Sequence, residues 1–444
     1  MKFIALGAAE SGVGAAILAR DKGYDVFVSD MGSIKPRYKQ MLDAEGIAWE
    51  EGGHTAEHIL QADLVVKSPG IPDTAPMVAA LRERGVPVIS EIEFAARYTD
   101  ARMICITGSN GKTTTTSLVY HILKNKAGMD VGLAGNIGHS LALQVAREPH
   151  AAYVIELSSF QLDGMYDFRA NVAVLLNITP DHLDRYGFVM QNYVNSKMRI
   201  MQNQQAGDTF IYWTGDQHIP HELSLRPTAA TVLPFSDAPE AGSTGYADDG
   251  TFRLTAPVPF TMPMSRFSLP GLHNLRNGLA AAQAALAAGA PAEAVEAGLA
   301  DFPGVEHRLE RVATVGGVHY VNDSKATNVD ACHVALEAMP APIVLIVGGK
   351  DKGNDYDDIL PLVKEKCRAV VYLGADNSKL HAAFDGLGLP IADTASMADC
   401  VAACARLAHE GDTVLLSPCC ASFDLFRNME DRGEQFKERV KALG

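Results

Sequence analysis

The sequence has no run of about 18 apolar residues, the length that a membrane-spanning helix needs. Positive charge is also in short supply, because 38 Lys and Arg residues face 53 Asp and Glu residues, which gives a formal net charge of −15. General binding to nucleic acid or to an anionic membrane requires basic surface, so this balance argues against both. Anionic ligands must instead be held locally, by loops, helix ends and metal ions.

Cysteine is scarce and irregularly spaced, with seven residues in a chain of 444. Cys400 and Cys404 lie one helical turn apart and Cys419 and Cys420 are adjacent, and neither pair has the spacing of a zinc site. We therefore expect buried or free thiols in a reducing compartment. The first residues lead straight into a short strand and a glycine turn, without a cationic and apolar leader, so we expect a cytoplasmic protein.

The composition is that of a globular protein, with 47% apolar and 20% charged residues. At roughly 100–200 residues per domain, the length predicts two to four domains that each bury a core. The chain has no internal repeat or low-complexity tract, and strand and helix patterns alternate along it. We expect three α/β domains, at residues 1–92, 93–303 and 304–444.

The segment MICITGSNGKTTTT, residues 103–116, organises the middle of the chain. An apolar strand leads into a glycine-rich turn whose N–H groups can face an anion, and the following helix adds the positive end of its dipole. Lys112 places a charge at the outer phosphates, and the Thr113 hydroxyl can bind Mg²⁺. The loop is shorter than the usual G-x-x-x-x-G-K-T, because Ile106 stands five residues before Gly111. A turn that only starts a helix is the alternative, but the strand–loop–helix context predicts a nucleotide-phosphate site.

The first stretch predicts a small doubly wound unit with strands at residues 2–6, 25–29, 64–66 and 86–89. Residues 7–14 are expected to form a glycine turn and residues 15–22 a helix. Asp30 follows at a distance that suits NAD binding. However, residues 7–12 lack the middle glycine of G-x-G-x-x-G, and the unit is short for two mononucleotide halves. A nucleotide diphosphate on Ser11 and Gly12 therefore fits better than a full dinucleotide.

Polar residues follow two further strands expected in the central stretch. The run 152–155 ends in Glu156, and the run 172–176 is followed by a loop that contains His182. Ligands of open parallel sheets sit beyond the carboxyl ends of the strands, so these side chains should approach the phosphate loop. Glu156 is then the natural Mg²⁺ carboxylate, with a surface or helix-capping acid as the alternative.

One lysine lies on the wrong face of a predicted helix. Met190, Tyr193, Val194 and Met198 form an apolar helical face, and Lys197 falls on it. It is either a lysine that snorkels at the edge of the core or one turned into the site with a lowered pKa. A neutral amine can add CO₂ and become a carbamate, which is an anionic ligand for magnesium.

The rest of the chain supplies two more sets of candidates. Asn274 and Asn277 share one face of a long alanine-rich helix and either cap it or hold a base or ribose. In the last stretch, polar clusters follow strands expected at residues 319–322, 343–347, 369–373 and 413–416. Lys325 and Lys352 lie in two of these clusters, where they are either solvated or form a cationic pocket for an anionic ligand.

The chain resembles the Mur ligase family along its whole length, because eight segments occur in that family's order. They are TGSNGKTTTT, ELSSFQL, LNITPDHLDRY, NYVNSKMRI, LPGLHNLRN, HRLE, NDSKATNVDA and SPCCASFDLF. The combination with GGKDKG is most similar to the member that joins D-glutamate to UDP-N-acetylmuramoyl-L-alanine, and the DNPR motif of the diaminopimelate-adding relative is absent. The resemblance implies a Rossmann-like N-terminal domain for the UDP-sugar, a central P-loop ATP-binding α/β domain and a Rossmann-like C-terminal domain for the amino acid.

The resemblance also implies an ATP-dependent amide ligase that works through an acyl phosphate and acts in peptidoglycan precursor synthesis. The implied catalytic residues are Lys112, Glu156, His182, Lys197 and Lys325. Contacts to ATP are implied for Gly108, Asn110, Gly111, Lys112, Thr113, Thr114, Asn274, Asn277, Arg308 and Asp323. Contacts to the UDP-sugar are implied for Ser11, Gly12, Asp30, Gly70, Asn136 and His182. Contacts to D-glutamate are implied for Lys325, Thr327, Lys352, Ser422 and Phe423. Two Mg²⁺ sites are implied, with Thr113 at one and Glu156, His182 and carbamylated Lys197 at the other.

The chain departs from the family pattern at three places: Ala8-Ala9 in the first turn, Met31-Gly32 where a polar and basic pair often contacts uracil, and Met429 where an aromatic is common near D-glutamate. Another Mur-type ligase, or a ligase similar to folylpolyglutamate synthase, is the nearest alternative. An ATPase switch and an NAD-dependent oxidoreductase are the alternatives outside the ligases. The expected substrates are small molecules, and a monomer is expected.

Overall fold

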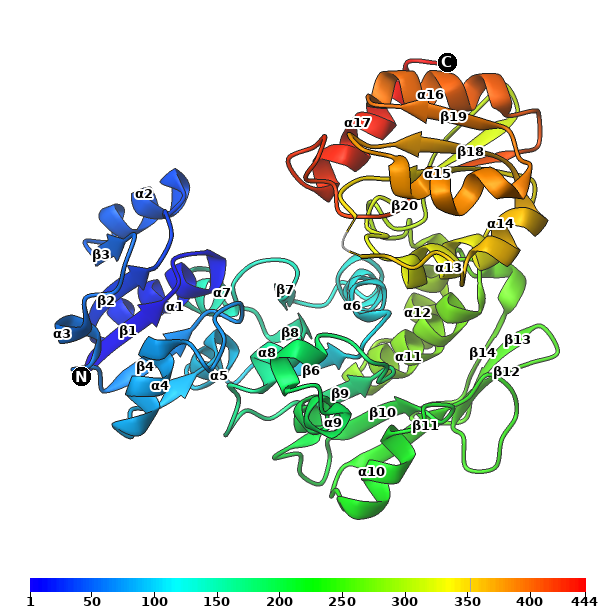
Figure 1. The fold of residues 1–444 in the computed structure, drawn as a ribbon. Helices are drawn as coiled ribbons and strands as arrows, with labels where there is room; N and C mark the ends of the chain where they lie inside the picture. The colour runs from blue at the N-terminus through cyan, green and yellow to red at the C-terminus, as the bar shows by residue number, and fades with distance from the viewer. Residues whose placement is uncertain (352) are drawn as a thin grey trace. The chain divides into compact units, whose positions relative to one another are not determined.

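The computed structural model describes residues 1–351 and 353–444. The described chain forms a five-stranded, a nine-stranded and a six-stranded sheet, with helices packed on them (Figure 1). It divides into two compact units, the first made of Met1–Phe267 with His273–Phe302 and the second of Ser268–Leu272 with Pro303–Gly444. Since the first unit contains two of the sheets, the domain boundary expected near residue 92 stays a prediction. In the described residues, no helix combines the length and apolar character that crossing a membrane requires.

The N-terminal sheet is entirely parallel, with strand order β3-β2-β1-β4-β5. Its strands are β1 (Lys2–Leu6), β2 (Asp25–Asp30), β3 (Ala48–Glu51), β4 (Leu64–Lys67) and β5 (Val88–Ile89). Its helices are α1 (Glu10–Asp21), α2 (Pro36–Ala44), α3 (Ala56–Ile59), α4 (Pro76–Glu83) and α5 (Glu91–Ala96). The sequence did not predict β3, a short strand at the edge of the sheet whose residues are half-buried or exposed.

The expected start of the first helix was wrong, because α1 begins at Glu10 and not at residue 15. The glycines were read as turn residues, but Gly12 and Gly14 lie inside the helix, where they permit close packing. A Cβ at Gly12 would lie 1.8 Å from the Gly7 carbonyl oxygen, and one at Gly14 would lie 2.0 Å from Ser140 Oγ. The glycine turn is therefore short, and Ser11 belongs to the first turn of the helix.

The nine-stranded sheet has the order β14-β13-β12-β11-β10-β9-β6-β8-β7. Pairing from β7 to β12 is parallel, and β13 and β14 extend the sheet as antiparallel strands. The strands are β6 (Arg102–Thr107), β7 (Val131–Gly135), β8 (Ala152–Glu156), β9 (Val172–Leu175), β10 (Thr209–Trp213), β11 (Thr231–Phe235), β12 (Gly245–Asp248), β13 (Thr251–Leu254) and β14 (Phe260–Pro263). The helices of this part are α6 (Lys112–Tyr120), α7 (Leu141–Arg147), α8 (Ser159–Leu162), α9 (Met190–Met198), α10 (Ile219–Leu225), α11 (Leu272–Ala288) and α12 (Ala292–Asp301).

The third sheet has the order β15-β16-β20-β17-β18-β19, and only β15 runs antiparallel to its neighbour. The strands are β15 (Glu310–Val315), β16 (Val318–Asn322), β17 (Ile343–Gly348), β18 (Cys367–Leu373), β19 (Ile391–Thr394) and β20 (Thr413–Cys419). The helices are α13 (Val329–Ala338), α14 (Leu360–Lys366), α15 (Ser378–Phe384), α16 (Met397–Leu407) and α17 (Met429–Lys441). Successive strand residues point to opposite faces, so Leu345 joins one buried cluster and Val344 and Ile346 join the other. Both faces are covered, which explains the unbroken apolar runs of these strands.

All seven cysteines are buried and free, as expected from their spacing. Cys105 lies in the central sheet, and the other six lie in the second unit. Burial raises the pKa of the Cys367 thiol to about 12, so this group stays a protonated, unreactive thiol near neutral pH. The cysteines therefore act as small apolar core residues.

Candidate functional site

The expected phosphate loop lies between the end of β6 and the start of α6. Gly111 precedes the helix with a φ of +84°, in the left-handed region. A Cβ at this position would lie 2.4 Å from Asn277 Oδ1. Glycine is therefore required here both for its backbone conformation and for the close approach of α11. The first turn of α6 follows this glycine directly, and the N–H groups and dipole at the start of a helix favour an anion.

The loop is tied to the segment that follows β9. The Ser109 N–H donates to the Asn177 carbonyl at 2.8 Å, and the Asn110 N–H donates to Asn177 Oδ1, also at 2.8 Å. Ser109 Oγ donates to the Thr179 carbonyl at 2.9 Å and lies 3.1 Å from the Tyr193 hydroxyl. The sequence indicated no role in a site for Ser109, Thr179 or the Tyr193 hydroxyl, since Tyr193 is expected there only as part of an apolar helical face.

Glu156 lies at the end of β8, paired in register with Ile106 of the neighbouring β6. Its side chain is 1% exposed. Oε1 accepts a hydrogen bond from Asn136 Nδ2 at 2.7 Å, whereas Oε2 is buried without a hydrogen-bond partner in the described residues. Burying a carboxylate oxygen without a partner is costly. A divalent cation at Oε2 would satisfy it, so this side chain fits a magnesium ligand.

Lys197 lies inside the protein, on α9, with 1% of its surface exposed. Its Nζ donates to the Gly108 carbonyl at 2.7 Å and lies 4.7 Å from the centre of the Tyr193 ring. Burial, followed by the positive charge of Lys112, holds the pKa of the Lys197 amine well below its usual value. The side chain thus points to the phosphate loop instead of snorkelling to the surface.

His182 occupies the rim of the same region, with a φ of 50° and a side chain that is 55% exposed. Its Nε2 lies 3.5 Å from Asp181 Oδ2, and its ring packs edge-on against Phe160 with centroids 5.2 Å apart. The interactions described for His182 do not include Glu156 or Lys197, so a shared metal site of the three residues stays a prediction.

Asn274 and Asn277 are both buried on the first turns of α11. Asn277 Nδ2 donates to Asn274 Oδ1 at 3.2 Å, and Thr115 Oγ1 donates to Asn277 Oδ1 at 3.2 Å. The pair therefore joins α11 to the helix of the phosphate loop. Thr113 and Thr114 are buried at the start of that helix.

In the N-terminal sheet, Asp30 fixes the two loops around it. Its Oδ2 accepts from the Ala8 N–H at 2.6 Å, and its Oδ1 accepts from the Gly32 N–H at 2.8 Å. Met31, next to it, is 64% exposed. Asp30 thus ties the first βα turn to the loop after β2, and the diphosphate site at Ser11 and Gly12 stays a prediction.

Gly70 lies in the exposed loop after β4, and Arg185 clamps this loop. The Arg185 guanidinium donates to the Gly70 carbonyl at 3.3 Å and to the Ile71 carbonyl at 3.4 Å. The same guanidinium lies 4.3 Å from the centre of the Phe160 ring. The sequence carried no signal for Arg185, because the loop to which it donates hydrogen bonds lies more than 110 positions away in the chain.

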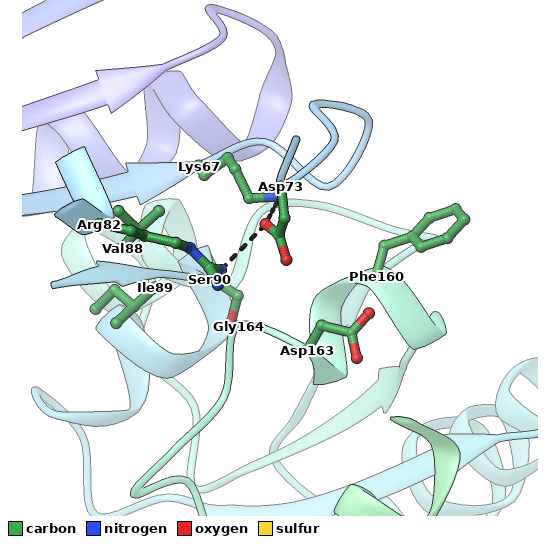
Figure 2. Close-up of a pocket in the computed structure, with 9 residues that line it drawn as sticks. All are labelled: Lys67, Asp73, Arg82, Val88, Ile89, Ser90, Phe160, Asp163 and Gly164. Atoms are coloured by element: carbon green, nitrogen blue, oxygen red, sulfur yellow. Dashed lines mark ion pairs between the residues drawn. The ribbon is translucent and has the colours of Figure 1, made fainter. Parts of the chain in front are cut away.

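A small pocket lies beside this loop and is shown in Figure 2. Lys67 and Arg82 both form ion pairs with Asp73, at 3.3 and 3.1 Å. Lys67 also donates to the Ile71 carbonyl at 2.7 Å. Burial lowers the pKa of Lys67 and raises the pKa of Asp163 on the opposite wall. Lys67 thus stabilises the loop that contains Gly70 by donating to the neighbouring Ile71 carbonyl.

In the second unit, Asp323 follows β16 and is buried. Its Oδ2 accepts from Ser417 Oγ at 2.9 Å and its Oδ1 accepts from the Leu309 N–H at 3.2 Å. Burial raises the pKa of Asp323 to about 7, although the positive charge of Arg308 opposes the shift. Arg308 Nε is buried and has no hydrogen-bond partner in the described residues, so the pair could accept a polar ligand.

The polar clusters of this unit meet at one edge of the sheet. The Lys350 N–H donates to the Ala421 carbonyl at 2.8 Å, and the Lys325 N–H donates to the His307 carbonyl at 3.0 Å. Thr327 is half-buried, Ser422 is 2% exposed and Phe423 is 66% exposed. Lys352 lies outside the described residues.

Glu306, His307 and Glu434 lie close enough together to hold a metal ion by spacing alone. The ammonium of Lys437 lies among these acids, 2.8 Å from Glu434 and 3.3 Å from Glu310, and it also pairs with Glu306. Because Lys437 already forms ion pairs with all three carboxylates, we interpret the cluster as a structural ion-pair network.

The fold and the phosphate loop define a multidomain α/β enzyme that binds a nucleotide, and the comparison with known families identifies its class. The Mur ligase middle domain matches residues 106–285, the "Mur ligase, glutamate ligase domain" matches residues 307–420, and the MurD N-terminal domain matches residues 2–77. The chain belongs to the Mur ligase family, and it is a ligase. The family resemblance read from the sequence is therefore confirmed.

Full-length relatives carry a more specific name. A UDP-N-acetylmuramoylalanine--D-glutamate ligase from Bacteroides fragilis is 61% identical, over 100% of both chains. A ligase of the same name from Bacteroides thetaiotaomicron is 59% identical, again over 100% of both chains. Among solved structures, UDP-N-acetylmuramate-alanine ligase MurC from Thermotoga maritima covers 100% of both chains with a TM-score of 0.62 at 20% identity. That likeness supports the fold alone, and the predicted three-domain α/β architecture is confirmed.

Proposed function

We propose that this protein joins D-glutamate to UDP-N-acetylmuramoyl-L-alanine with the cleavage of ATP to ADP and phosphate. The observation that carries the proposal is 61% identity over the full length of a relative with that name. The described geometry supports it, because a phosphate loop precedes α6 and the buried side chain of Lys197 donates to that loop. The reaction belongs to peptidoglycan precursor synthesis, and we propose a cytoplasmic monomer.

The first step is phosphoryl transfer to the carboxylate of the UDP-linked substrate. The N–H groups and dipole of α6 hold the ATP phosphates, together with Gly108, Asn110, Gly111, Lys112, Thr113 and Thr114. The substrate carboxylate attacks the γ-phosphorus, the bond to the bridging oxygen of ADP breaks, and an acyl phosphate forms. Two anions meet in this step, so catalysis consists mainly of positioning and charge neutralisation. Asn274, Asn277, Arg308 and Asp323 hold the nucleoside part.

Magnesium supplies charge neutralisation at the transferring phosphoryl group when it is bound. Thr113 holds one ion, and Glu156, His182 and carbamylated Lys197 hold the second. The buried, unpartnered Oε2 of Glu156 supports this assignment. The Lys197 amine reaches its anionic form by adding CO₂, which forms an N–C bond and releases one proton.

The second step makes the amide. The amino nitrogen of D-glutamate attacks the acyl carbon, a tetrahedral intermediate forms, and phosphate leaves. Lys325 and Lys352 hold the carboxylates of D-glutamate, and Thr327, Ser422 and Phe423 complete its pocket. The UDP-sugar is held by Ser11, Gly12, Asp30, Gly70, Asn136 and His182.

The test is phosphate release from ATP with UDP-N-acetylmuramoyl-L-alanine and a panel of amino acids. We expect release only when D-glutamate is present together with the UDP-linked substrate. Preference for another amino acid would favour another ligase of the family. Equal release without any amino acid would favour an ATPase switch, and a change in nicotinamide absorbance with NAD would favour an oxidoreductase.

A further inference from the structure

The largest fully buried side chain of the second unit is a cation. Arg432, on the first turn of α17, is 1% exposed. All three of its hydrogen bonds go to uncharged oxygens: Nε to Ser324 Oγ at 3.0 Å, Nη2 to the Ser324 carbonyl at 2.8 Å and Nη1 to the Cys420 carbonyl at 3.1 Å. A guanidinium buried without a paired carboxylate is expensive, so its position calls for a reason.

The two residues that accept these hydrogen bonds lie in the two loops in which the amino acid site is proposed. Ser324 is adjacent to Lys325, in the loop after β16, and Cys420 lies two residues before Ser422, in the loop after β20. The positions of Ser324 and Cys420 differ by 96 in the sequence, and the Arg432 guanidinium donates hydrogen bonds to both. A planar guanidinium with five donors can hold two backbones in one geometry, which a lysine cannot.

A third loop closes over the same guanidinium. A Cβ at Gly349 would lie 3.3 Å from Arg432 Nη1 and 2.3 Å from the Ala421 carbonyl oxygen. Gly349 has a φ of +128°, and the N–H of the next residue, Lys350, donates to Ala421. Glycine is thus needed for this loop to lie against the other two.

The start of α17 is in turn locked to the first loop. Ser324 Oγ accepts from Arg432 and donates to the Met429 carbonyl at 2.7 Å. The Asn428 side chain caps the helix by accepting from the Asp431 N–H at 2.7 Å. Burial lowers the pKa of Arg432 only to about 10, so it keeps its positive charge at neutral pH. This charge therefore lies directly under the loops that carry Lys325 and Ser422.

We propose that Arg432 is a positioning residue for the amino acid substrate: it ties the loops after β16 and β20 together and lies against the loop after β17, and its buried charge favours a dicarboxylate above them. The inference rests on the proposed function, because it uses the amino acid site assigned there. It predicts that Arg432 governs the apparent affinity for D-glutamate and has little effect on the affinities for ATP and the UDP-linked substrate.

The test compares Arg432→Lys and Arg432→Met with the matched controls Arg439→Lys and Arg439→Met, since Arg439 is exposed on the same helix. In Arg432→Lys, we expect the KM for D-glutamate to rise at least ~10-fold, the loss expected when charge-assisted hydrogen bonds are removed. The KM values for ATP and the UDP-linked substrate should stay within about twofold, and the Arg439 variants should match the wild type. Amide hydrogen exchange should become faster around Ser324 and Cys420.

Ser324→Ala provides a second, milder variant if Arg432→Met does not fold. It removes one acceptor of Arg432 and the bond to Met429, so the KM for D-glutamate should rise in the same direction. A wild-type protein that does not use D-glutamate would overturn the proposed function. A wild type that uses it, with an unchanged KM for D-glutamate in Arg432→Lys or an equal rise of all three KM values, would overturn the positioning role alone.

Discussion

The ammonium groups of Lys112 and Lys197 both donate to the carbonyl oxygen of Gly108, at 2.8 and 2.7 Å. Burial lowers the pKa of Lys197 well below its usual value, and the repulsion between two cations on one carbonyl lowers it further. A larger fraction of the Lys197 amine is therefore neutral than in an exposed lysine, and the neutral amine is the form that adds CO₂. The phosphate loop and the proposed carbamate are thus electrostatically linked.

Lys197→Ala is expected to reduce ligase activity at least ~100-fold, because the charge balance at the transferring phosphoryl group is lost. Short carboxylic acids such as acetate or formate should restore part of the activity, since they can replace the carbamate in the cavity that the variant leaves. Phosphate release with and without added acid measures this. Lys364→Ala, at an exposed lysine, is the control. A fully active Lys197→Ala protein would contradict the carbamate.

Gly111→Ala tests the left-handed turn that begins α6. We expect the free energy of unfolding to fall by about 1–2 kcal/mol because of the φ of +84° alone. A further loss and a weaker apparent affinity for ATP should come from the contact of the new Cβ with Asn277. Gly23→Ala is a matched control, because Gly23 has a φ of +81° but nothing within 4 Å of its Cβ position. Urea unfolding and the KM for ATP separate the two effects, and equal losses in both variants would rule out the contact with Asn277.

Glu91→Gln should change how stability depends on pH. Glu91 accepts from Ser140 Oγ at 2.7 Å and from the Ala142 N–H at 2.6 Å, with Glu10 also facing it. Burial raises its pKa from 4.5 to about 7, so between these values the folded state holds a proton that the unfolded chain releases. The free energy of unfolding should therefore fall as pH rises from about 4.5 to 7, by at most ~1.4 kcal/mol per pH unit.

The Glu91→Gln variant should lose this slope, because a glutamine does not titrate. The slope is measured by urea unfolding of the first unit at several pH values between 4.5 and 7.5. Glu83→Gln is the control, because Glu83 is exposed on α4. A slope that persists unchanged in Glu91→Gln would show that another group causes it.

Lys325→Ala is expected to raise the KM for D-glutamate about 10–100-fold with a smaller effect on the KM for ATP, because one charge-assisted contact to a carboxylate is lost. Initial rates at saturating ATP and UDP-linked substrate measure it, with Lys364→Ala as the control. If the KM for D-glutamate did not change, Lys325 would not belong to that pocket.

The phosphate loop could be predicted because its function depends on local chain order. Glycine, lysine and threonine must follow a strand directly, so the spacing around Gly111 and Lys112 carries the signal. Lys197 could be placed for a similar reason, since the period of 3.6 residues puts it on the apolar face of α9. The strand ends that carry Glu156 and Asp323 follow from the rule that parallel strands share one rim.

Other features depend on distant partners, which the sequence does not show. The glycines of α1 looked like a turn, but a Cβ at Gly14 would collide with Ser140, more than a hundred residues away. The sequence did not predict β7, because Gly132 interrupts its apolar pattern. Glycine is needed there because a Cβ would lie 2.4 Å from Gln144 Oε1. Arg185 donates to the Gly70 carbonyl, 115 positions away, and Arg432 donates to the Ser324 carbonyl, 108 positions away. No local pattern marks an arginine for such a role.

The buried cysteines are unevenly distributed, so their labelling can report which part of the chain unfolds. The central sheet holds Cys105, the second unit holds six cysteines, and the N-terminal sheet holds none. A thiol-reactive dye should thus label the native protein slowly, and it should label the central sheet at Cys105 or the second unit at its six cysteines when that part opens. Peptide mapping of the labelled sites would then show which of these two parts opens first, without any engineered probe.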